Sequence, residues 1–360
     1  MKPMTSKERI HNILNRKPVD RIGSYEHFWA ATNPQWIQEG LMEKDEDVSD
    51  HFNFDIREHW SLNLVADTAF GEKTVEEDED TVTYLNGNGA TLRKHKKHTT
   101  TPEHVAFSVK DRNDWEEKIK PLLKAAPDRI DFAAYRKARE NAAHKNLFFT
   151  LSGINVFEAI HPVCGHENML MGMALDPDWV SEMASTYAEL IVNLHEILFE
   201  KEGLPDGIWY YEDMGFKERP FMSAQMYREL IGPAHKKTID FAHAKGLKVI
   251  MHSCGFVEPL LPDMVESGID CLQVIEIKAG MEPLRIKKNF GDRIALCGGF
   301  DARNLANNDI PAIKRELDEK IPALKEGFGY ILHSDHSVPE SCTHETYKFF
   351  IDYGLRLGTY

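Results

Sequence analysis

Residues 247–255 read Leu247-Lys248-Val249-Ile250-Met251-His252-Ser253-Cys254-Gly255, a short apolar run that ends in a histidine, a thiol and a glycine. An apolar run of this length, closed by a turn residue, is typical of a buried strand. The polar residues that follow the run lie where such a strand leaves the core. The stretch therefore predicts a barrel strand that delivers a soft metal site to a pocket.

Five further apolar runs follow residue 146, and helical patterns lie between them. The runs cover residues 147–151, 207–211, 271–275, 293–297 and 329–333. The helical patterns include residues 226–244, 259–267 and 310–325, and each is closed by a glycine, as helix ends often are. Strands that alternate with helices indicate βα units and a parallel sheet.

Two more strands are expected nearer the N-terminus. Tyr25, His27 and Trp29 alternate with the residues between them, which is strand periodicity, and another strand is expected within residues 31–130. An amphipathic lead-in with Tyr25 and Trp29 in the core explains the first pattern equally well. With both strands the chain has eight, which predicts a (β/α)8 TIM barrel.

The barrel is expected to form one domain over residues 1–360. An open doubly wound sheet is the alternative fold. No Gly-x-Gly-x-x-Gly turn follows an early strand, so the dinucleotide-binding form of that sheet lacks its main support.

Residues 31–130 are the least regular part of the chain. Residues 81–85 and 90–93 flank Asn86-Gly87-Asn88-Gly89, a strong hairpin signal because Asn and Gly tolerate positive φ. The acidic run 76–80 has no apolar face and predicts a solvated loop. We therefore expect an antiparallel hairpin insertion in the N-terminal third.

The composition excludes several classes of partner. The formal net charge is -15, whereas binding nucleic acid or an anionic membrane surface requires a basic footprint. The 5 cysteines are spread without a closely spaced framework, which favours reduced thiols. Residues 1–9 lack the apolar stretch of a signal peptide, and no segment reaches the ~18 apolar residues that cross a bilayer. A cytoplasmic protein is expected.

Polar residues follow the predicted strands, at the end of a barrel where chemistry takes place. His252 and Cys254, two residues apart on a strand, would point to the same face and could both bind zinc. A buried thiol beside a hydrogen-bonded histidine is the alternative. Glu212, Asp335 and His336 follow other strands and could complete a tetrahedral site.

The chain resembles the uroporphyrinogen decarboxylase superfamily, which also contains zinc-dependent corrinoid methyltransferases. The resemblance implies a (β/α)8 barrel with its pocket at the carboxyl ends of the strands. It rests on residues 5–21, 211–214, 252–255, 298–301 and 334–339.

The resemblance is closer to the methyltransferase branch. True porphyrinogen decarboxylases carry an arginine-rich segment after the first strand, whereas residues 27–32 here read His-Phe-Trp-Ala-Ala-Thr, which disfavours a substrate with many carboxylates. The methyltransferases bind zinc through a His-x-Cys pair, which His252 and Cys254 match, and a later cysteine. This chain has Asp335 and His336 where that cysteine is expected.

The resemblance implies methyl transfer between a small methylated substrate or a thiol and a corrinoid carried by a separate protein. Zinc would lower the pKa of a bound thiol or polarise the oxygen of a methyl ether. Glu212 or Asp213 would manage protons. The substrate, for which a methoxylated aromatic is one candidate, would face Tyr25, His27 and Trp29, with Asn155 after another predicted strand as a further contact.

Two other functions remain open at this point. In a metal-free decarboxylase, Asp55, Asp213 or Asp301 would stabilise a protonated pyrrole intermediate, and His252 and Cys254 would only line the pocket. In a non-catalytic module the same pocket would bind a corrinoid or a tetrapyrrole.

Overall fold

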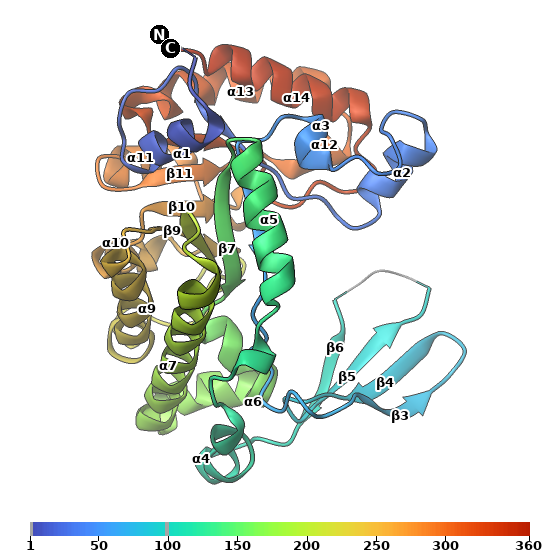
Figure 1. Ribbon diagram of the computed structural model, residues 1–360, viewed down its shortest axis with the longest axis vertical. Helices are drawn as coiled ribbons and strands as arrows, with labels where there is room; N and C mark the ends of the chain where they lie inside the picture. The colour runs from blue at the N-terminus through green and yellow to red at the C-terminus, as the bar shows by residue number, and fades with distance from the viewer. Residues whose placement is uncertain (1–2, 98–100) are drawn as a thin grey trace.

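The computed structural model describes residues 3–97 and 101–360, so the first two residues of the N-terminal segment lie outside it. Within these residues, eight parallel strands form one curled sheet in the order β1-β12-β11-β10-β9-β8-β7-β2 (Figure 1). They are β1 (Gly23–Ser24), β2 (Ile56–Trp60), β7 (Phe148–Ile154), β8 (Gly207–Tyr211), β9 (Lys248–Ser253), β10 (Cys271–Val274), β11 (Ala295–Gly298) and β12 (Tyr330–Leu332). The backbone N–H of Asp55 donates to Ser24 O at 2.9 Å, where the two end strands meet. The predicted (β/α)8 architecture is confirmed.

The strands β7 to β12 were recognisable from the sequence because most of their residues are apolar and buried. All residues of β10, β11 and β12 are buried, as expected for parallel strands covered by helices. The predicted strand at residues 25–29 is shifted, since β1 ends at Ser24. Beyond it, Tyr25 N still donates to Leu332 O at 3.2 Å, and Phe28 forms an isolated parallel bridge with Val338.

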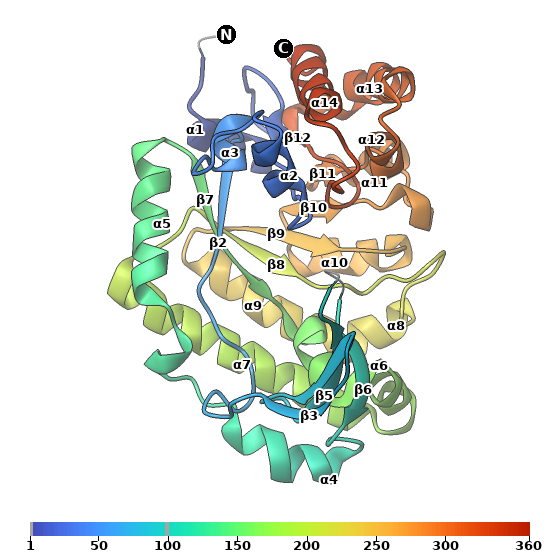
Figure 2. The same cartoon turned by 90° about the vertical axis from the view of Figure 1, so that its right-hand side faces the viewer.

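Helices surround the sheet, and Figure 2 shows α7 and α9 running along one side of it. They are α1 (Ser6–Leu14), α2 (Thr32–Gln38), α3 (Val48–His51), α4 (Arg112–Asp114), α5 (Phe132–His144), α6 (Val156–Leu175), α7 (Pro177–Glu202), α8 (Ala224–Met226), α9 (Gly232–Ala244), α10 (Leu261–Ser267), α11 (Pro283–Phe290), α12 (Ala302–Ala306), α13 (Ile310–Leu324) and α14 (His344–Leu357). The helix predicted over residues 226–244 contains a π-helical segment, Tyr227–Ile231, between α8 and α9. No helix of the described residues is long and apolar enough to span a bilayer.

A second sheet interrupts the barrel and lies beside α6 (Figure 1). In the described part of the chain its strands are β3 (Lys73–Glu77), β4 (Thr81–Leu85), β5 (Ala90–His95) and β6 (Glu103–Phe107), all antiparallel. The hairpin prediction is confirmed and extended, but the acidic run 76–80 is not all loop, because Glu76 and Glu77 pair with β4. Gly165 lets this sheet approach α6, since a Cβ atom there would lie 2.5 Å from the Phe107 ring.

Asp55 closes the barrel at the amino end of β2. Its side chain is fully buried, and it accepts hydrogen bonds from Arg9 Nη1 at 2.6 Å, Arg21 Nη1 at 2.8 Å and Ser24 N at 2.9 Å. The pocket of such a barrel lies at the opposite end of the strands. The hypothesis that Asp55 stabilises a pyrrole intermediate is therefore wrong, because the two arginines and the strand β1 take up its carboxylate.

Replacing Asp55 with Asn should destabilise the fold by about 3 kcal/mol, because Arg9 Nη1 and Arg21 lose their buried charged acceptor and Arg9 keeps only its ion pair with Asp20. Urea unfolding of the wild type and the variant measures this difference. Asp263→Asn is the matched control, since Asp263 pairs with the exposed Arg228 and its loss should cost at most about 1 kcal/mol. Equal losses in the two variants would contradict the proposed role of Asp55 in closing the barrel.

Candidate metal centre

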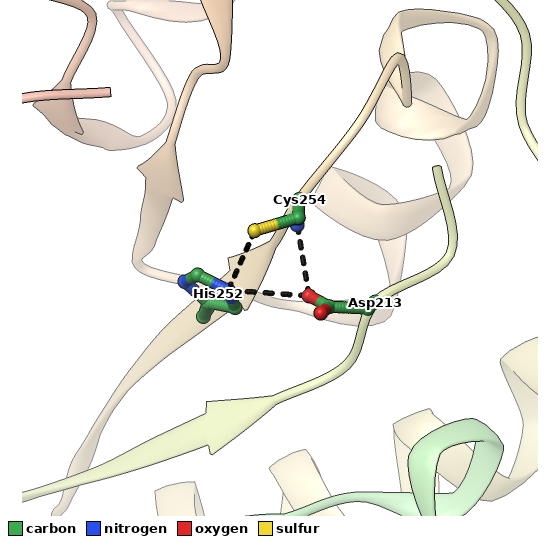
Figure 3. Close-up of side chains that lie close together, drawn as sticks. All are labelled: Asp213, His252 and Cys254. Atoms are coloured by element: carbon green, nitrogen blue, oxygen red, sulfur yellow. Dashed lines mark hydrogen bonds and ion pairs between the residues drawn. The ribbon is translucent and has the colours of Figure 1, made fainter. Parts of the chain in front are cut away.

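Three potential metal ligands meet where β8 and β9 end. Asp213 follows β8, His252 is in β9, and Cys254 follows β9 (Figure 3). His252 Nε2 lies 3.1 Å from Asp213 Oδ1 and 3.3 Å from Cys254 Sγ. Among the described residues, this is the group of histidine, cysteine and carboxylate side chains whose ligand atoms all lie within 4.8 Å of one another.

Hydrogen bonds join the loop after β8 to the loop after β9, which fixes the positions of these side chains. Cys254 N donates to Asp213 Oδ1 at 2.9 Å, and Met214 N donates to Ser253 Oγ at 3.0 Å. Gly255 has a φ of 77°, and a Cβ atom there would lie 2.3 Å from the carbonyl carbon of Gly215, which leaves no room for a side chain. The loops therefore cross at van der Waals distance directly beside the ligand atoms.

Cys254 differs from the other cysteines in exposure. All five are free thiols, and four of them are buried, whereas Cys254 is partly exposed. The buried thiols are Cys164, Cys271, Cys297 and Cys342. Among the described cysteines, Cys254 is thus the thiol that a metal ion could reach.

Hydrogen bonding across the barrel determines which nitrogen of His252 faces the cluster. His333 Nδ1 lies 2.6 Å from Ser334 O, which can only accept, so the proton of His333 is on Nδ1 and its Nε2 accepts. Gln273 Nε2 donates to this Nε2 at 3.3 Å, which leaves Gln273 Oε1 as the acceptor for His252 Nδ1–H. His252 Nε2 therefore faces Asp213 and Cys254, and it is the nitrogen that would bind a metal ion in place of the proton that it donates to Asp213.

The electrostatics of the cluster favour a bound cation. Burial alone would lower the pKa of His252, but Cys254 and Asp213 outweigh it and raise that pKa well above its ordinary value. Desolvation raises the pKa of Asp213, but the hydrogen bond and charge of His252 and the hydrogen bond from Cys254 N together outweigh it and lower that pKa to about 2. Burial raises the pKa of the Cys254 thiol, and His252 acts against that shift.

The donor set fits zinc. Catalytic zinc sites combine three protein ligands with one open position, and zinc accepts imidazole, thiolate and carboxylate. A zinc-binding histidine usually donates its second N–H to a neighbouring oxygen, and Gln273 provides that oxygen for His252. The residues present thus supply both the ligands and the outer contact that orients one of them.

Glu212, expected as a ligand or a proton carrier, is not in the cluster. Its side chain is fully buried against the amino end of α6, where the carboxylate accepts hydrogen bonds from Phe157 N at 2.6 Å and Glu158 N at 3.0 Å. His235 Nε2 binds the same carboxylate. Glu212 therefore connects the end of β8 to the amino end of α6, while the next residue, Asp213, points to the cluster.

Asp335 and His336 are also placed elsewhere. The two oxygens of Asp335 accept from Ile277 N and Ala302 N, both at 2.8 Å, so Asp335 joins the loops that follow β10 and β11. Burial raises the pKa of Asp335 to about 6. The ring of His336 stacks on Trp29 with centroids 6.0 Å apart. The structure does not bring these side chains to His252 and Cys254.

Asp301 and Asn155 cap helices. Asp301 accepts from Arg303 N at 2.9 Å at the start of α12, and from the Arg303 guanidinium. Asn155 is fully buried, where its Oδ1 accepts from Val156 N at 3.0 Å and its Nδ2 donates to Thr238 Oγ1 at 3.1 Å. Their predicted catalytic and substrate-binding roles stay predictions.

The three residues expected to face the substrate have different surroundings. Tyr25 is in the core, with its ring centroid 5.3 Å from that of Trp209. Trp29 is exposed at the rim. His27 is partly exposed and its Nδ1 lies 2.9 Å from His333 Nε2, so it joins the hydrogen-bonded chain that begins at His252.

Sequence reasoning missed Gln273, His333 and Glu58, which surround the candidate site. Gln273 is a polar residue inside an apolar run, and that position is the sequence signal that could have drawn attention to it, since a buried amide needs hydrogen-bond partners. His333 ends another apolar run, and Glu58 is in β2, which had no recognisable strand pattern.

The geometry so far defines a (β/α)8 barrel with a candidate metal centre at the carboxyl ends of β8 and β9. The sequence profile of the uroporphyrinogen decarboxylase (URO-D) family matches residues 154–355, more than half of the chain. The protein therefore belongs to the uroporphyrinogen decarboxylase family.

Two individual proteins are similar to this chain. A methylated-thiol–coenzyme M methyltransferase of Methanosarcina mazei is 30% identical over 90 residues, which are 25% of this chain and 23% of that protein. The match thus spans about a quarter of the curated relative. A solved structure of a methyltransferase from Methanosarcina mazei covers 97% of this chain and 98% of its own, with a TM-score of 0.69 and 16% identity, which supports the shared fold.

Replacing Gln273 with Leu should weaken zinc binding about 10- to 100-fold, because His252 would lose the acceptor that orients it. Gln273→Glu keeps an acceptor at that position and should restore the affinity. Competition with a chromogenic chelator measures the affinity. Gln225→Leu, on the exposed surface of α8, serves as the control. Wild-type affinity in Gln273→Leu would contradict the proton assignment.

Glu26 lies under the same network. It is buried, and it accepts from Ser334 N at 3.0 Å and from His27 N at 3.1 Å. Burial raises its pKa from 4.5 to about 8, against the effect of these hydrogen bonds. The folded protein therefore keeps a proton that the unfolded chain releases between these two pH values.

The contribution of Glu26 to stability should consequently fall as pH rises from about 5 to about 8, by at most about 1.4 kcal/mol per pH unit. Glu26→Gln should remove this pH-dependent contribution, so the free energy of unfolding of the variant should vary less with pH. Urea unfolding at four pH values compares the slopes, with the exposed Glu189→Gln as the control. The same slope in wild type and Glu26→Gln would refute the raised pKa.

Proposed function

We propose that the protein is a zinc-dependent methyltransferase that moves a methyl group between a small methylated substrate, or a thiol, and a corrinoid carrier protein. The observation that supports this most directly is the Asp213–His252–Cys254 cluster at the strand ends of a barrel of this family. The curated relative is named as a methyltransferase of methylated thiols, and that name is consistent with the proposal.

The ligand set differs from one built on two thiolates. The third donor of the cluster is the Asp213 carboxylate, so the site has one sulfur, one nitrogen and one oxygen donor. Bound zinc would supply Lewis acidity to a thiol or to an ether oxygen. A carboxylate in place of a thiolate leaves the metal more electrophilic, which suits an oxygen ligand.

The wall beside the cluster is aromatic. The Tyr211 ring lies 4.8 Å from the His252 ring, and the Trp60 ring lies 4.9 Å from that of Tyr211. Aromatic surfaces with a few polar groups suit small neutral ligands better than a polyanion. This wall supports a methylated aromatic or aliphatic substrate more than a tetrapyrrole with many carboxylates.

Zinc content tests the proposal. Protein purified with added zinc should hold one equivalent, and His252→Ala and Cys254→Ser should each lose most of it, whereas the exposed His11→Ala should not. Methyl transfer from methylcobalamin to 2-mercaptoethanol is then followed by the absorbance of the corrinoid. Lack of zinc in the wild type contradicts the proposal, and zinc without methyl transfer to or from any probe favours the non-catalytic corrinoid-binding module.

A further inference from the structure

A cavity lies outside the barrel wall, with β7 and β8 on one side and α6 and α7 on the other. Its volume is about 290 Å³, and the described residues that line it include Gly153, Tyr210, Ala159 and Ile191, one from each of these elements. Residues 62–65, which follow β2, form a further wall. An apolar cavity of about 150 Å³ is large enough to bind benzene, so this one has room for a larger molecule of that kind.

The cavity and the interior of the barrel lie on opposite faces of the sheet. Gly153 and Tyr210 are paired in the parallel ladder and point to the same face, where the Tyr210 ring lies 6.1 Å from that of His195 on α7. Trp209 precedes Tyr210 and points to the other face, where its ring lies 5.6 Å from that of His27. The cavity is therefore separated from the interior of the barrel by the strands themselves.

The wall formed by residues 62–65 is held in place by the protein's own contacts. Arg129 is buried, and its guanidinium donates to Asn63 O at 3.2 Å and to Ala66 O at 2.8 Å. Ala66 N donates in turn to Asn88 Oδ1 at 2.8 Å, which joins this segment to the hairpin. The cavity is thus formed without a ligand, as most small-molecule sites are.

His195 gives the lining of the cavity a polar atom without a partner. The side chain is 2% exposed, and its Nδ1 has no hydrogen-bond partner among the described residues. Burial lowers the pKa of His195 to about 3, so the ring is uncharged at neutral pH. A nitrogen of a neutral imidazole either donates or accepts, and a hydroxyl group can complement both forms. A ligand hydroxyl would therefore satisfy a buried atom that the protein leaves unpaired.

The lining disfavours a charged ligand. None of the described residues that line the cavity has a charged side chain at neutral pH. Removing an ion from water without a compensating partner is costly, whereas an apolar molecule gains free energy from the same transfer. The chemistry of the walls thus selects an uncharged molecule.

Gly153 keeps the cavity open. A Cβ atom at this position would meet no atom within 4 Å, and the φ of Gly153 is not positive, so its backbone would accept any side chain. The space in front of β7 therefore depends on the absence of a side chain at one residue, which offers a direct way to fill it.

We propose that this cavity is a second binding site, separate from the metal centre, for a small uncharged molecule that is mostly apolar and carries one hydroxyl group. The apolar side chains of Leu62, Leu64 and Ile191 supply contact area, and a hydrogen bond to His195 Nδ1 orients the ligand. The inference goes beyond the proposed function, because it requires neither zinc nor methyl transfer.

The test compares three fluorescent probes on the zinc-free protein, namely 2-naphthol, naphthalene and 2-naphthoate. Naphthalene should bind about 3- to 10-fold more weakly than 2-naphthol, because it lacks the hydroxyl that pairs with His195. The carboxylate of 2-naphthoate should weaken binding about 10-fold or more. The change in probe fluorescence on titration with the protein gives each affinity, and this comparison needs no variant.

Two variants locate the bound probe. Gly153→Leu should weaken binding of 2-naphthol about 10-fold or more, because the new side chain occupies the same space. Gly71→Leu is the matched control, since a Cβ atom there also meets no atom within 4 Å and Gly71 does not line the cavity. His195→Phe keeps an aromatic ring and should lower the affinity for 2-naphthol to that for naphthalene.

A metal-centre variant completes the test, because Trp60 lines the cavity and also packs against Tyr211. Cys254→Ser should bind 2-naphthol as the wild type does, and weaker binding would place the probe at the metal centre and overturn the separate site. Absence of binding to the wild type, or unchanged binding in Gly153→Leu, would also overturn the site. Equal affinities for 2-naphthol and naphthalene would overturn the assignment of a hydroxyl-bearing ligand.

Discussion

The barrel depends on the buried contacts of Asp55, because β1 is too short to join its neighbour β2 by a regular ladder. β1 has 2 residues, and the side chain of Asp55 supplements the backbone pairing by accepting from Ser24 N. Ion pairs with Arg9 and Arg21 compensate the negative charge of the buried carboxylate. A closed barrel in turn brings the strand ends together at the opposite face, and everything proposed about function depends on that convergence.

At that face, most of the acidic and amide side chains hold the loops in place. Glu212, Asp335 and Asn155 accept hydrogen bonds from backbone N–H groups, which would otherwise be unpaired where strands pass into helices. A carboxylate used in this way has little capacity left for a metal ion. Asp213 also accepts a backbone hydrogen bond, from Cys254 N, but the same oxygen faces His252 and the side chain is 45% exposed.

A chain of hydrogen bonds runs from His252 through Gln273 and His333 to His27. Its direction is set by one carbonyl oxygen, Ser334 O, which places the proton of His333 on Nδ1. From there each donor and acceptor follows in turn. The metal-facing nitrogen of His252 and the contact of His27 Nδ1 with His333 both follow from that single contact, so His27 is connected to the candidate metal centre through buried side chains.

The sequence by itself determined the fold class, the hairpin and the His252–Cys254 pair, because apolar runs, Asn-Gly turns and a two-residue spacing on a strand are local patterns. The tertiary structure alone decided which third residue joins that pair. Glu212 and Asp213 are adjacent in the sequence, and successive side chains leave a strand end in different directions, so only the assembled barrel shows that Glu212 binds the start of α6 and Asp213 faces His252. Gln273, His333 and Glu58 were missed for the same reason, since their importance lies in contacts between strands that are far apart along the chain.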